Sequence, residues 1–498
     1  MASRLCNASR IGRLSRATLS GSKSTFHTSA LHHQPYQQET ARFYLPHESV
    51  PHAATILGFP SRQSVSKALH PGTCREIVDL AATIAEFEPV RLYTRPEDIS
   101  SAQELIKQRV NTSERLGLIH DSQNNQKNGS SRPVPGLQSR VQIIPCPTNH
   151  CWVRDTGPVF VRPVDPDPIP NPTTTTTQQQ QQRFAINFSF CEWGNKHIDP
   201  IFTDLPEEST LPSDTHNPKT TWPIPSPTTL AENTDFAARV IASFSPSSSS
   251  SPTNPTIITT PLRLEGGGIE VDGQGTFFAT ESSIFCPERN PGLTRATAEK
   301  ELSRLFGVRK FIWFPGRKGL DITDAHVDAL VRVVRPGVVV VSRPWSYDYG
   351  SRGERMEETT STSTGGAVPS RESTRHEWRR NFEEIRAILA HETDALGRRF
   401  EVHEIAEPDP RYLTTQQQNN GVVAEGEEEG DPAASYVNFY FVNGAVVMPV
   451  FGDPGADERA VRTMRRLLPE REVRTVRVNC LPRMGGVVHC VTQQVPAL

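Results

Sequence analysis

The chain has 498 residues, of which 35% are hydrophobic and 42 are prolines. This length allows two to four average domains, and the low apolar share favours folded cores interrupted by polar insertions. A formal net charge of −3 provides no basic surface for nucleic acid. No stretch reaches the roughly 20 apolar residues of a membrane-spanning helix, so we expect neither nucleic acid nor a membrane as a partner.

The cysteines number eight and form no C-x-x-C pair, which is sparse for a chain of this length. This usage disfavours a disulfide scaffold and favours a reducing compartment. An individual cysteine can then be either a small buried hydrophobe or a reactive thiol.

The first 38 residues differ from the rest of the chain. They contain five basic residues and many serines, and no acidic residue occurs before Glu39. An Arg-rich, acid-free start without a long apolar segment is typical of a mitochondrial transit peptide. The alternative is a disordered tail on a cytoplasmic protein. We exclude 1–38 from the fold and expect 39–498 to form a single domain.

Five low-complexity segments interrupt this domain. Their Ser, Thr, Pro, Gln and Glu tracts cannot bury enough apolar surface to fold. We interpret them as surface insertions, because the pieces between them are too short to have cores of their own. They cover 120–136, 164–182, 245–256, 351–374 and 414–432.

Strand-like and helix-like runs alternate between the insertions. Strands alternating with single helices are typical of an α/β fold. In chain order we predict a helix over 74–87, strands over 90–94, 140–146, 158–164, 184–190 and 268–280, a helix over 294–307, strands over 311–316 and 338–342, a helix over 379–392, a strand pair over 437–451, a helix over 457–470 and a strand over 474–479.

The order strand, strand, helix, strand occurs clearly twice, over 268–314 and 436–479. In the first unit, Thr294 and Gly307 fit the start and stop signals of the helix between them. A repeated ββαβ unit indicates a repeat architecture, and repeats around an axis form propellers.

Four polar clusters interrupt the apolar runs, each beside glycine or turn residues. Asp155 lies in "VRDTGP", Glu265 precedes three glycines, His326 and Asp328 lie in "DAHVDAL", and Cys490 follows "MGGVVH". Each has a structural alternative: a turn start, a glycine-turn cap, a solvated helix start and a small buried hydrophobe. Because the four occur together at strand ends, where catalytic groups usually lie, we interpret them as one site.

The motifs of cofactor chemistry are missing from the sequence. It contains no H-E-x-x-H, no deaminase cysteine pair, no phosphate-binding P-loop and no complete dinucleotide fingerprint. What remains is a cysteine nucleophile with a histidine and several carboxylates, and we expect no metal or cofactor. Such a site suits a planar cation such as a guanidinium, which carboxylates can hold bidentately.

These clusters resemble a known family, the guanidino-group-modifying enzymes, and within it agmatine deiminase and the bacterial-type peptidylarginine deiminases. The resemblance covers most of the chain from about residue 43 onward, between the insertions. It is carried by "WVRDTGPVFV", "EGGGIEVDGQGT", "ITDAHVDAL", "SYVNFYFVNGAVVMPVFGD" and "GGVVHCVTQQVP". It implies the pentein fold, a five-bladed α/β propeller of ββαβ units with the active site on its axis.

The resemblance also implies a role for each candidate residue. Cys490 is expected as the nucleophile, and His326 as the general acid that later activates water. Asp155 and Asp328 are expected to hold the guanidinium, while Glu265 orients His326.

The substrate pocket is less defined by the resemblance. Trp152 and Trp193 are expected as walls of the pocket. Relatives commonly have a glycine at the position of Ala325 and often a polar residue at that of Val487. These departures leave the chemistry intact and put the shape around the substrate tail in question.

The expected reaction is the hydrolysis of agmatine to N-carbamoylputrescine and ammonia, a step of putrescine and polyamine biosynthesis, through a covalent thiouronium intermediate on cysteine. Within the class the alternative is a protein-arginine deiminase, which converts arginine side chains to citrulline. From another class, the alternative is an inactive propeller that acts as a binding module. The resemblance also suggests a homodimer.

Overall fold

The computed structural model describes residues 43–115, 137–164, 183–196, 226–244, 255–345, 371–414 and 432–497. All of them belong to the unit Thr40–Leu498, one of two into which the chain divides, the other being Met1–Glu39. The predicted transit peptide and almost all of the predicted insertions lie outside the described residues. Three predicted boundaries are wrong: residues 371–374 form the first turn of a helix, Thr256 begins a strand and Thr414 ends a short helix.

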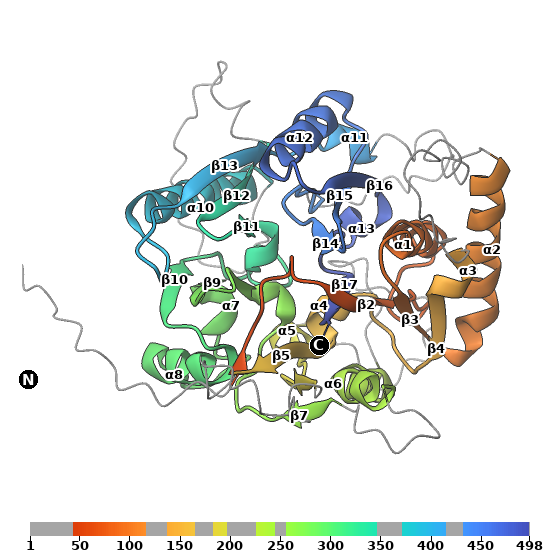
Figure 1. The fold of residues 1–498 in the computed structure, drawn as a ribbon, viewed down its shortest axis with the longest axis horizontal. Coiled ribbons are helices and arrows are strands. Elements are labelled where there is room, and N and C mark those ends of the chain that lie inside the picture. The colour runs from red at the N-terminus through yellow and green to blue at the C-terminus, as the bar shows by residue number, and fades with distance from the viewer. Residues whose placement is uncertain are drawn as a thin grey trace, which may run out of the picture. The chain divides into compact units, whose positions relative to one another are not determined.

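The described residues form five β-sheets of three or four strands, and each sheet contains the same succession of elements. Two strands pair antiparallel, a helix follows, and the next strand pairs parallel with the second one. This is the ββαβ unit that the sequence predicted twice. The predicted α/β class is confirmed, and three further units join the two expected ones (Figure 1).

The five units have the following bounds. The first contains β5 (Val159–Pro163), β6 (Phe184–Ile186), α6 (Pro227–Ala242) and β7 (Thr256–Ile258), with β1 (Phe43–Tyr44) beside β5. The second contains β8 (Glu270–Val271), β9 (Thr276–Thr280), α8 (Arg295–Phe306) and β10 (Lys310–Phe314). The third contains β11 (Val331–Arg335), β12 (Val338–Arg343), α10 (Arg371–His391) and β13 (Glu401–Ala406). The fourth contains β14 (Tyr440–Val442), β15 (Ala445–Val450), α12 (Pro454–Leu467) and β16 (Glu472–Arg477).

The fifth unit joins the two ends of the described chain. Its first strand is β17 (Thr492–Pro496), which pairs antiparallel with β2 (His52–Gly58) and places Thr492 opposite Leu57. Its other elements are α1 (His70–Ala85), β3 (Val90–Thr94), α2 (Ile99–Arg115) and β4 (Val141–Pro145). Figure 1 shows β17 beside β2, next to the label of the C-terminus. The segment that ends in Cys490 is therefore held by a strand and does not fray.

Short helical turns lie between and within the units, and those before the first strands carry much of the candidate site. They are η1 (Pro96–Asp98), α3 (Leu137–Arg140), α4 (Val153–Thr156), α5 (Glu192–Asn195), η5 (Gly266–Gly268), α7 (Glu281–Ile284), η6 (Val327–Ala329), α11 (Arg411–Thr414) and α13 (Cys480–Arg483).

Local sequence signals account for the ends of the long helices. The side chain of Thr294 accepts a hydrogen bond from the Thr297 N–H at the start of α8, and Gly307 ends the helix with a φ of +66°. That left-handed conformation favours glycine because a Cβ would crowd the backbone. Asp453 caps α12 in the same manner, accepting from two backbone N–H groups. Both helices lie where the sequence predicts them.

Other elements depart from the sequence prediction. Helices α2 and α6, and strands β1, β2, β7, β11, β13 and β17, are absent from it. The strand expected over 184–190 ends at Ile186, because the following residues turn: Ser189, Trp193 and Asn195 have positive φ. Tertiary packing overrides strand propensity there.

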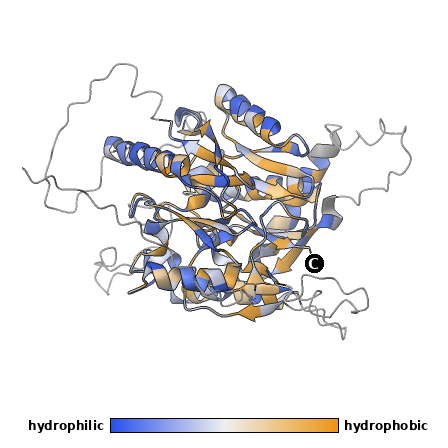
Figure 2. Cartoon of the chain, turned by 60° about the vertical axis from the view of Figure 1, so that its left-hand side comes forward, coloured by the Kyte–Doolittle hydropathy of each residue, from blue (hydrophilic) through white to orange (hydrophobic). Residues whose placement is uncertain are grey.

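Apolar side chains of the strands form the cores, and the helices cover them. In β12, Val339, Val340 and Val341 are completely buried. Figure 2 shows largely hydrophobic strands, whereas helices packed against them also carry hydrophilic residues. In the part of the chain that the structure describes, no helix combines the length and apolarity needed to cross a membrane.

Candidate active site

The five candidate residues come from the segments that precede the first strands of four units. Asp155 lies in α4 before β5, and Glu265 lies before η5 and β8. His326 and Asp328 flank the start of η6 before β11, and Cys490 precedes β17. Distances between side chains, given below, show that the structure brings all five together. Asp155, Glu265, His326 and Asp328 are each less than one tenth exposed, so the solvated-helix interpretation of "DAHVDAL" is wrong.

His326 lies between two carboxylates. Its Nε2 is 3.2 Å from Oε2 of Glu265, and its Nδ1 is 3.7 Å from Oδ1 of Asp155. Burial alone would lower the pKa of His326, but Asp155 and Glu265 outweigh it and hold the pKa above its usual value. The imidazole is therefore suited to carry a proton and to donate it.

Glu265 is held in its ionised form by Arg289. The Nε of Arg289 lies 2.9 and 3.0 Å from the two oxygens of Glu265, and its Nη1 lies 2.7 Å from Asp324. Burial alone would raise the pKa of Glu265, but Arg289 and His326 lower it to about 2. Glu265 therefore remains a hydrogen-bond acceptor for His326 at any physiological pH.

Asp155 is fixed by two donors. Trp193 Nε1 donates to its Oδ2 at 2.8 Å, and the Gly267 N–H donates to its Oδ1 at 3.0 Å. Burial, with Asp328 and Glu265 nearby, raises the pKa of Asp155 to about 6, although His326 opposes the rise.

Gly267 belongs to the run of three glycines. A Cβ at this position would lie 2.7 Å from Nδ1 of His326 and 2.8 Å from Oδ1 of Asp155. Both distances are too short for a real side chain, so the site requires glycine there.

Asp328 has one oxygen bound and one free. Its Oδ2 lies 2.7 Å from Nδ1 of His489, whereas its buried Oδ1 has no hydrogen-bond partner among the described residues. Burial alone would raise the pKa of Asp328, but the hydrogen bond from His489 lowers it. A buried carboxylate oxygen without a partner is costly, which indicates a place for a donor from a ligand.

Cys490 is half-buried, and its Sγ lies 3.6 Å from Oδ2 of Asp328. Burial, followed by the charges of Asp328 and Asp155, raises the pKa of the thiol well above its usual value. The thiol is therefore neutral until a positive charge enters the site.

Trp152 also borders the nucleophile. A Cβ on Gly486 would lie 2.6 Å from the Trp152 ring and 3.2 Å from Cβ of Cys490, so the ring packs directly against this glycine. Trp152 and Trp193 are both buried. Their expected role as pocket walls stays a prediction.

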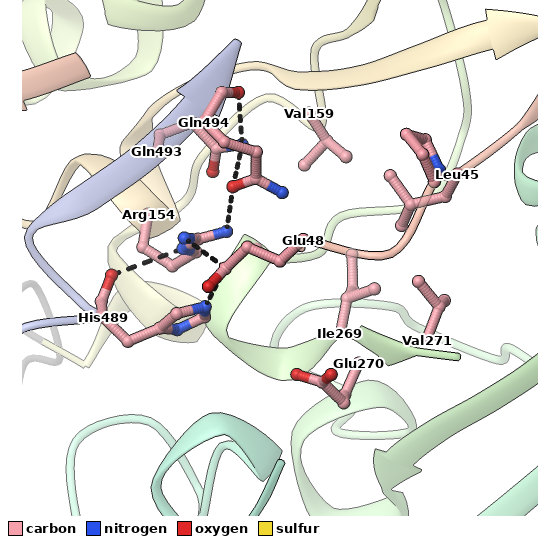
Figure 3. Close-up of a pocket in the computed structure, with 12 residues that line it drawn as sticks. Leu45, Glu48, Arg154, Val159, Ile269, Glu270, Val271, His489, Gln493 and Gln494 are labelled. Atoms are coloured by element: carbon pink, nitrogen blue, oxygen red, sulfur yellow. Dashed lines mark hydrogen bonds and ion pairs between the residues drawn. The ribbon is translucent and has the colours of Figure 1, made fainter. Parts of the chain in front are cut away.

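A cavity lies next to the candidate site, with a volume of about 390 Å³ including the open space at its mouth. Figure 3 shows Glu48, Arg154 and His489 in contact with one another among the residues that line it. Arg154 precedes Asp155 in the chain, and His489 precedes Cys490. The wall between cavity and site is thus built from consecutive residues of the same segments. The cavity is lined by Leu45, Pro46, Glu48, Arg154, Val159, Gly266, Ile269, Glu270, Val271, His489, Gln493 and Gln494.

Four residues beside the site were missed by sequence reasoning: Glu48, Arg289, Asn438 and His489. Asn438 stands in a stretch that carries the family resemblance, and His489 is adjacent to Cys490, but sequence reasoning singled out neither one. Glu48 lies in "LPHESVPHAATILGFPSR", which supports the resemblance more weakly. The fold offers a signal for Asn438, since it occupies the segment before the first strand of the fourth unit. Arg289 directly precedes Asn290-Pro291-Gly292, a turn signal that sequence reasoning did not use.

No group of three or more His, Cys, Asp or Glu side chains within the described residues is arranged to hold a metal ion. The cluster combines three carboxylates with an imidazole and a thiol. Its chemistry favours a cationic ligand that donates several hydrogen bonds, and it provides a nucleophile and a proton donor next to that ligand.

Solved structures identify the fold class. The agmatine deiminase of Enterococcus faecalis aligns with a TM-score of 0.60 at 20% sequence identity, over 91% of this chain and 96% of that one. The putative arginine deiminase of Porphyromonas gingivalis aligns with a TM-score of 0.58 at 20% identity, over 91% and 98% of the two chains. At these identities the similarity shows a shared mixed α/β fold.

Sequence comparison identifies the family. The model of the Porphyromonas-type peptidyl-arginine deiminase family matches residues 44–496, and the chain belongs to this family. It is 29% identical over 466 residues to the agmatine deiminase of Medicago truncatula, covering 92% of this chain and 97% of the relative. It is 28% identical over 458 residues to putative agmatine deiminase 1 of Listeria monocytogenes serotype 4b, covering 91% and 96%. The family resemblance inferred from the motifs is confirmed.

Proposed function

We propose that this chain is a deiminase that hydrolyses the guanidino group of agmatine, giving N-carbamoylputrescine and ammonia. The observation that carries the proposal is the buried Oδ1 of Asp328, which has no hydrogen-bond partner among the described residues, on a carboxylate whose other oxygen lies 3.6 Å from Sγ of Cys490. A guanidinium supplies both what the carboxylate lacks, a hydrogen-bond donor, and what the thiol lacks, a positive charge. The similarity to proteins named agmatine deiminase over more than nine tenths of the chain supports the same substrate.

In the proposed arrangement, Asp155 and Asp328 hold the guanidinium from two sides. The cation lowers the pKa of the adjacent thiol, and Cys490 Sγ then attacks the central carbon. His326 is the general acid, and Glu265 keeps the imidazole oriented through the contact of 3.2 Å. Trp152 and Trp193 enclose the planar group.

The reaction proceeds in two halves. In the first, the thiol loses its proton to solvent, the S–C bond forms and the C–N bond to one terminal nitrogen breaks, with His326 donating a proton so that ammonia leaves. In the second, His326 takes a proton from water and the hydroxyl adds to the carbon. The C–S bond then breaks with its electron pair returning to sulfur, and the proton of the added hydroxyl passes to the thiolate, which leaves the ureido carbonyl and the neutral thiol. The covalent intermediate divides one difficult displacement into two easier steps.

A peptidyl-arginine substrate is the second candidate. The description of the family itself, as peptidyl-arginine deiminases, favours it. The two candidates share the guanidino chemistry and differ only in the group beyond it, an aliphatic amine in one case and a polypeptide in the other. An inactive binding protein remains the alternative from another class.

The proposal extends to the arrangement of the sheets. We propose that the five ββαβ units form the blades of a propeller of the pentein type, with the pairing of β17 and β2 joining its ends. The position of the candidate residues, before the first strands of successive units, supports a site on the propeller axis. Residues 39–498 would then be one domain, residues 1–38 a mitochondrial targeting segment, and the assembly a homodimer.

The test is to incubate the purified protein with agmatine, free arginine and an arginine-containing peptide, and to measure ureido product and ammonia. We expect turnover of agmatine to be fastest. Faster turnover of the peptide would show that the substrate is peptidyl arginine and not agmatine. Absence of ureido product from all three would contradict a deiminase function.

A further inference from the structure

Asn438 occupies the fifth equivalent position of the fold. Four of the five units place a candidate site residue in the segment before their first strand, as described above. In the fourth unit that segment precedes β14 and contains Asn438, whose side chain is completely buried. A residue at this position therefore faces the same cluster as Asp155, Glu265, Asp328 and Cys490.

The orientation of the Asn438 amide is fixed by its partners. Its Oδ1 accepts hydrogen bonds from the backbone N–H of His489 at 2.9 Å and of Cys490 at 3.4 Å. A flipped amide would place its NH₂ group against two donors, so the oxygen has to be on this side. The Nδ2 group consequently points the other way, 3.3 Å from the carbonyl oxygen of Asp328 and 3.3 Å from Sγ of Cys490.

This amide serves both forms of the sulfur. A thiol S–H can donate to Oδ1 of Asn438 at 3.5 Å, and a thiolate can accept from Nδ2. Asp328, another polar neighbour at 3.6 Å, offers only negative charge. Burial, Asp328 and Asp155 raise the pKa of the thiol, whereas a backbone hydrogen bond at Val487 and the hydrogen bond of Asn438 lower it. Asn438 is thus a neutral side-chain donor that opposes the carboxylates.

We propose that Asn438 is a further catalytic residue, donating a hydrogen bond from Nδ2 to the sulfur of Cys490 whenever that sulfur carries negative charge. This inference rests on the proposed function, in which the sulfur is anionic twice. It is anionic before it attacks the guanidinium carbon, and again when the C–S bond breaks and the electron pair returns to it. In both states a donor at 3.3 Å lowers the energy of the thiolate.

Two substitutions separate this role from a purely structural one. Asn438→Asp keeps the oxygen that holds the His489 N–H and replaces the donor by a negative oxygen. Asn438→Ala removes both groups and adds no charge. A structural role makes Ala the more damaging change, because it releases the backbone of the nucleophile segment. A thiolate-stabilising role makes Asp the more damaging change, because it adds repulsion to the loss of the donor.

The first measurement is the rate at which iodoacetamide alkylates Cys490 as a function of pH, followed by mass spectrometry of its peptide. We expect the midpoint of this rate–pH profile to move to higher pH in the order wild type, Asn438→Ala, Asn438→Asp. The second is steady-state kinetics with agmatine, where kcat of Asn438→Asp should fall roughly tenfold or more. Its KM should not rise, since an added carboxylate does not repel the cation.

Asn443→Asp is the matched control, because it places the same change at the other end of β14. Asn443 bonds the backbone of His52 through both amide atoms and has no described contact with Cys490. We expect it to leave the alkylation profile unchanged. An equal shift in Asn443→Asp, an unchanged profile in folded Asn438→Asp, or a larger shift in Ala than in Asp would each overturn the inference.

The alkylation experiment needs no substrate. If none of the guanidino compounds is turned over, the proposed function fails, while the ordered shift of the thiol still establishes the hydrogen bond to sulfur. If agmatine is turned over and the shift is absent, only the role of Asn438 fails.

Discussion

The segments Arg154–Asp155 and His489–Cys490 separate the candidate site from the cavity beside Glu48. The carboxylates on the two sides of this wall differ in how their charges are balanced. On the side of Cys490, one oxygen of Asp328 has no partner among the described residues, and Asp155 has a pKa raised to about 6. On the side of the cavity, both oxygens of Glu48 are bound. They accept from Arg332 and Arg154, at 3.0 and 3.1 Å, and from a backbone N–H, and Nε2 of His489 lies 2.8 Å from one of them.

The comparison shows which buried carboxylates of this fold are fully hydrogen-bonded and which keep an oxygen without a partner among the described residues. Burial alone would raise the pKa of Glu48, but Arg332 and His489 hold it well below the usual range. A carboxylate that is fully paired contributes to stability only as long as its partners remain. The incompletely paired side is poised to bind a cation. We therefore expect changes on the Cys490 side to affect activity and changes around Glu48 to affect folding.

The largest expected effect is on the Cys490 side. Replacing Cys490 by Ser should lower kcat for agmatine by roughly 10⁴-fold or more, because the nucleophile is lost. The urea midpoint should not fall, since the half-buried sulfur contributes little to the core. Mass spectrometry of a quenched wild-type reaction should show an adduct on the peptide that contains Cys490. Substantial turnover by the Ser variant would make Cys490 a packing residue.

The next effect concerns the paired side. Arg332 is completely buried and contacts Glu48, Glu270 and the carbonyl of Phe439. Arg332→Leu should reduce the free energy of unfolding by about 3–5 kcal/mol, because it leaves Glu48 incompletely compensated in the interior. Urea unfolding of the wild type and of Arg332→Leu measures this loss of unfolding free energy.

The control for Arg332 is Arg304→Leu. Arg304 pairs with Glu301 on a partly exposed face of α8, and pairs open to solvent contribute about 1 kcal/mol or less. Equal losses of unfolding free energy in the two variants would show that the network around Glu48 contributes no more to stability than the Arg304–Glu301 pair.

A pH dependence follows from Asp155. In the folded protein its pKa is about 6, whereas an unfolded aspartate titrates near 4, so between these values the folded state retains a proton that the unfolded state releases. This contribution makes the wild type less stable as the pH rises through that window. The substitution Asp155→Asn removes this contribution to the pH dependence.

The measurement is urea unfolding of both proteins at several pH values between about 4 and 6. Across this window the stability of Asp155→Asn relative to the wild type should increase by roughly 2–3 kcal/mol. A constant difference between the two proteins would contradict the raised pKa.

The smallest effect concerns His489, which touches both sides of the wall. Its Nδ1 lies 2.7 Å from Asp328, and its Nε2 lies 2.8 Å from Glu48. Asn places an amide near the Nδ1 position, and Gln places one near the Nε2 position. We expect the contact with Asp328 to support substrate binding. KM for agmatine should therefore rise roughly tenfold more in His489→Gln, which loses this contact, than in His489→Asn, which keeps it.

His52 provides the control for His489. It is buried, lies 3.0 Å from Glu88 and 2.7 Å from the Glu48 carbonyl, and has no described contact with Asp328. The corresponding Asn and Gln variants of His52 should not differ in KM. A larger rise in His489→Asn than in His489→Gln would show that His489 acts through Glu48 instead.

How much the sequence could predict depended on how local the signal was. Asp155, Glu265, His326, Asp328 and Cys490 all stand beside glycines or turn residues at the ends of apolar runs, and the structure places them in one cluster. Two of the five ββαβ units were also readable, because their strands and helices follow each other closely. The other three contain long insertions or, in one case, join the two ends of the chain, so their continuity is lost in the sequence.

The sequence by itself determined the family, the α/β class and the groups that can perform chemistry, because turn geometry and strand periodicity are encoded within a few neighbouring residues. Only the tertiary structure decided which carboxylate is neutralised and which remains open. Glu48 and His489 meet across 441 positions, and Asn438 reaches the sulfur across 52. Partners so distant in the chain leave no local pattern, and the ionisation of a buried group depends on those partners.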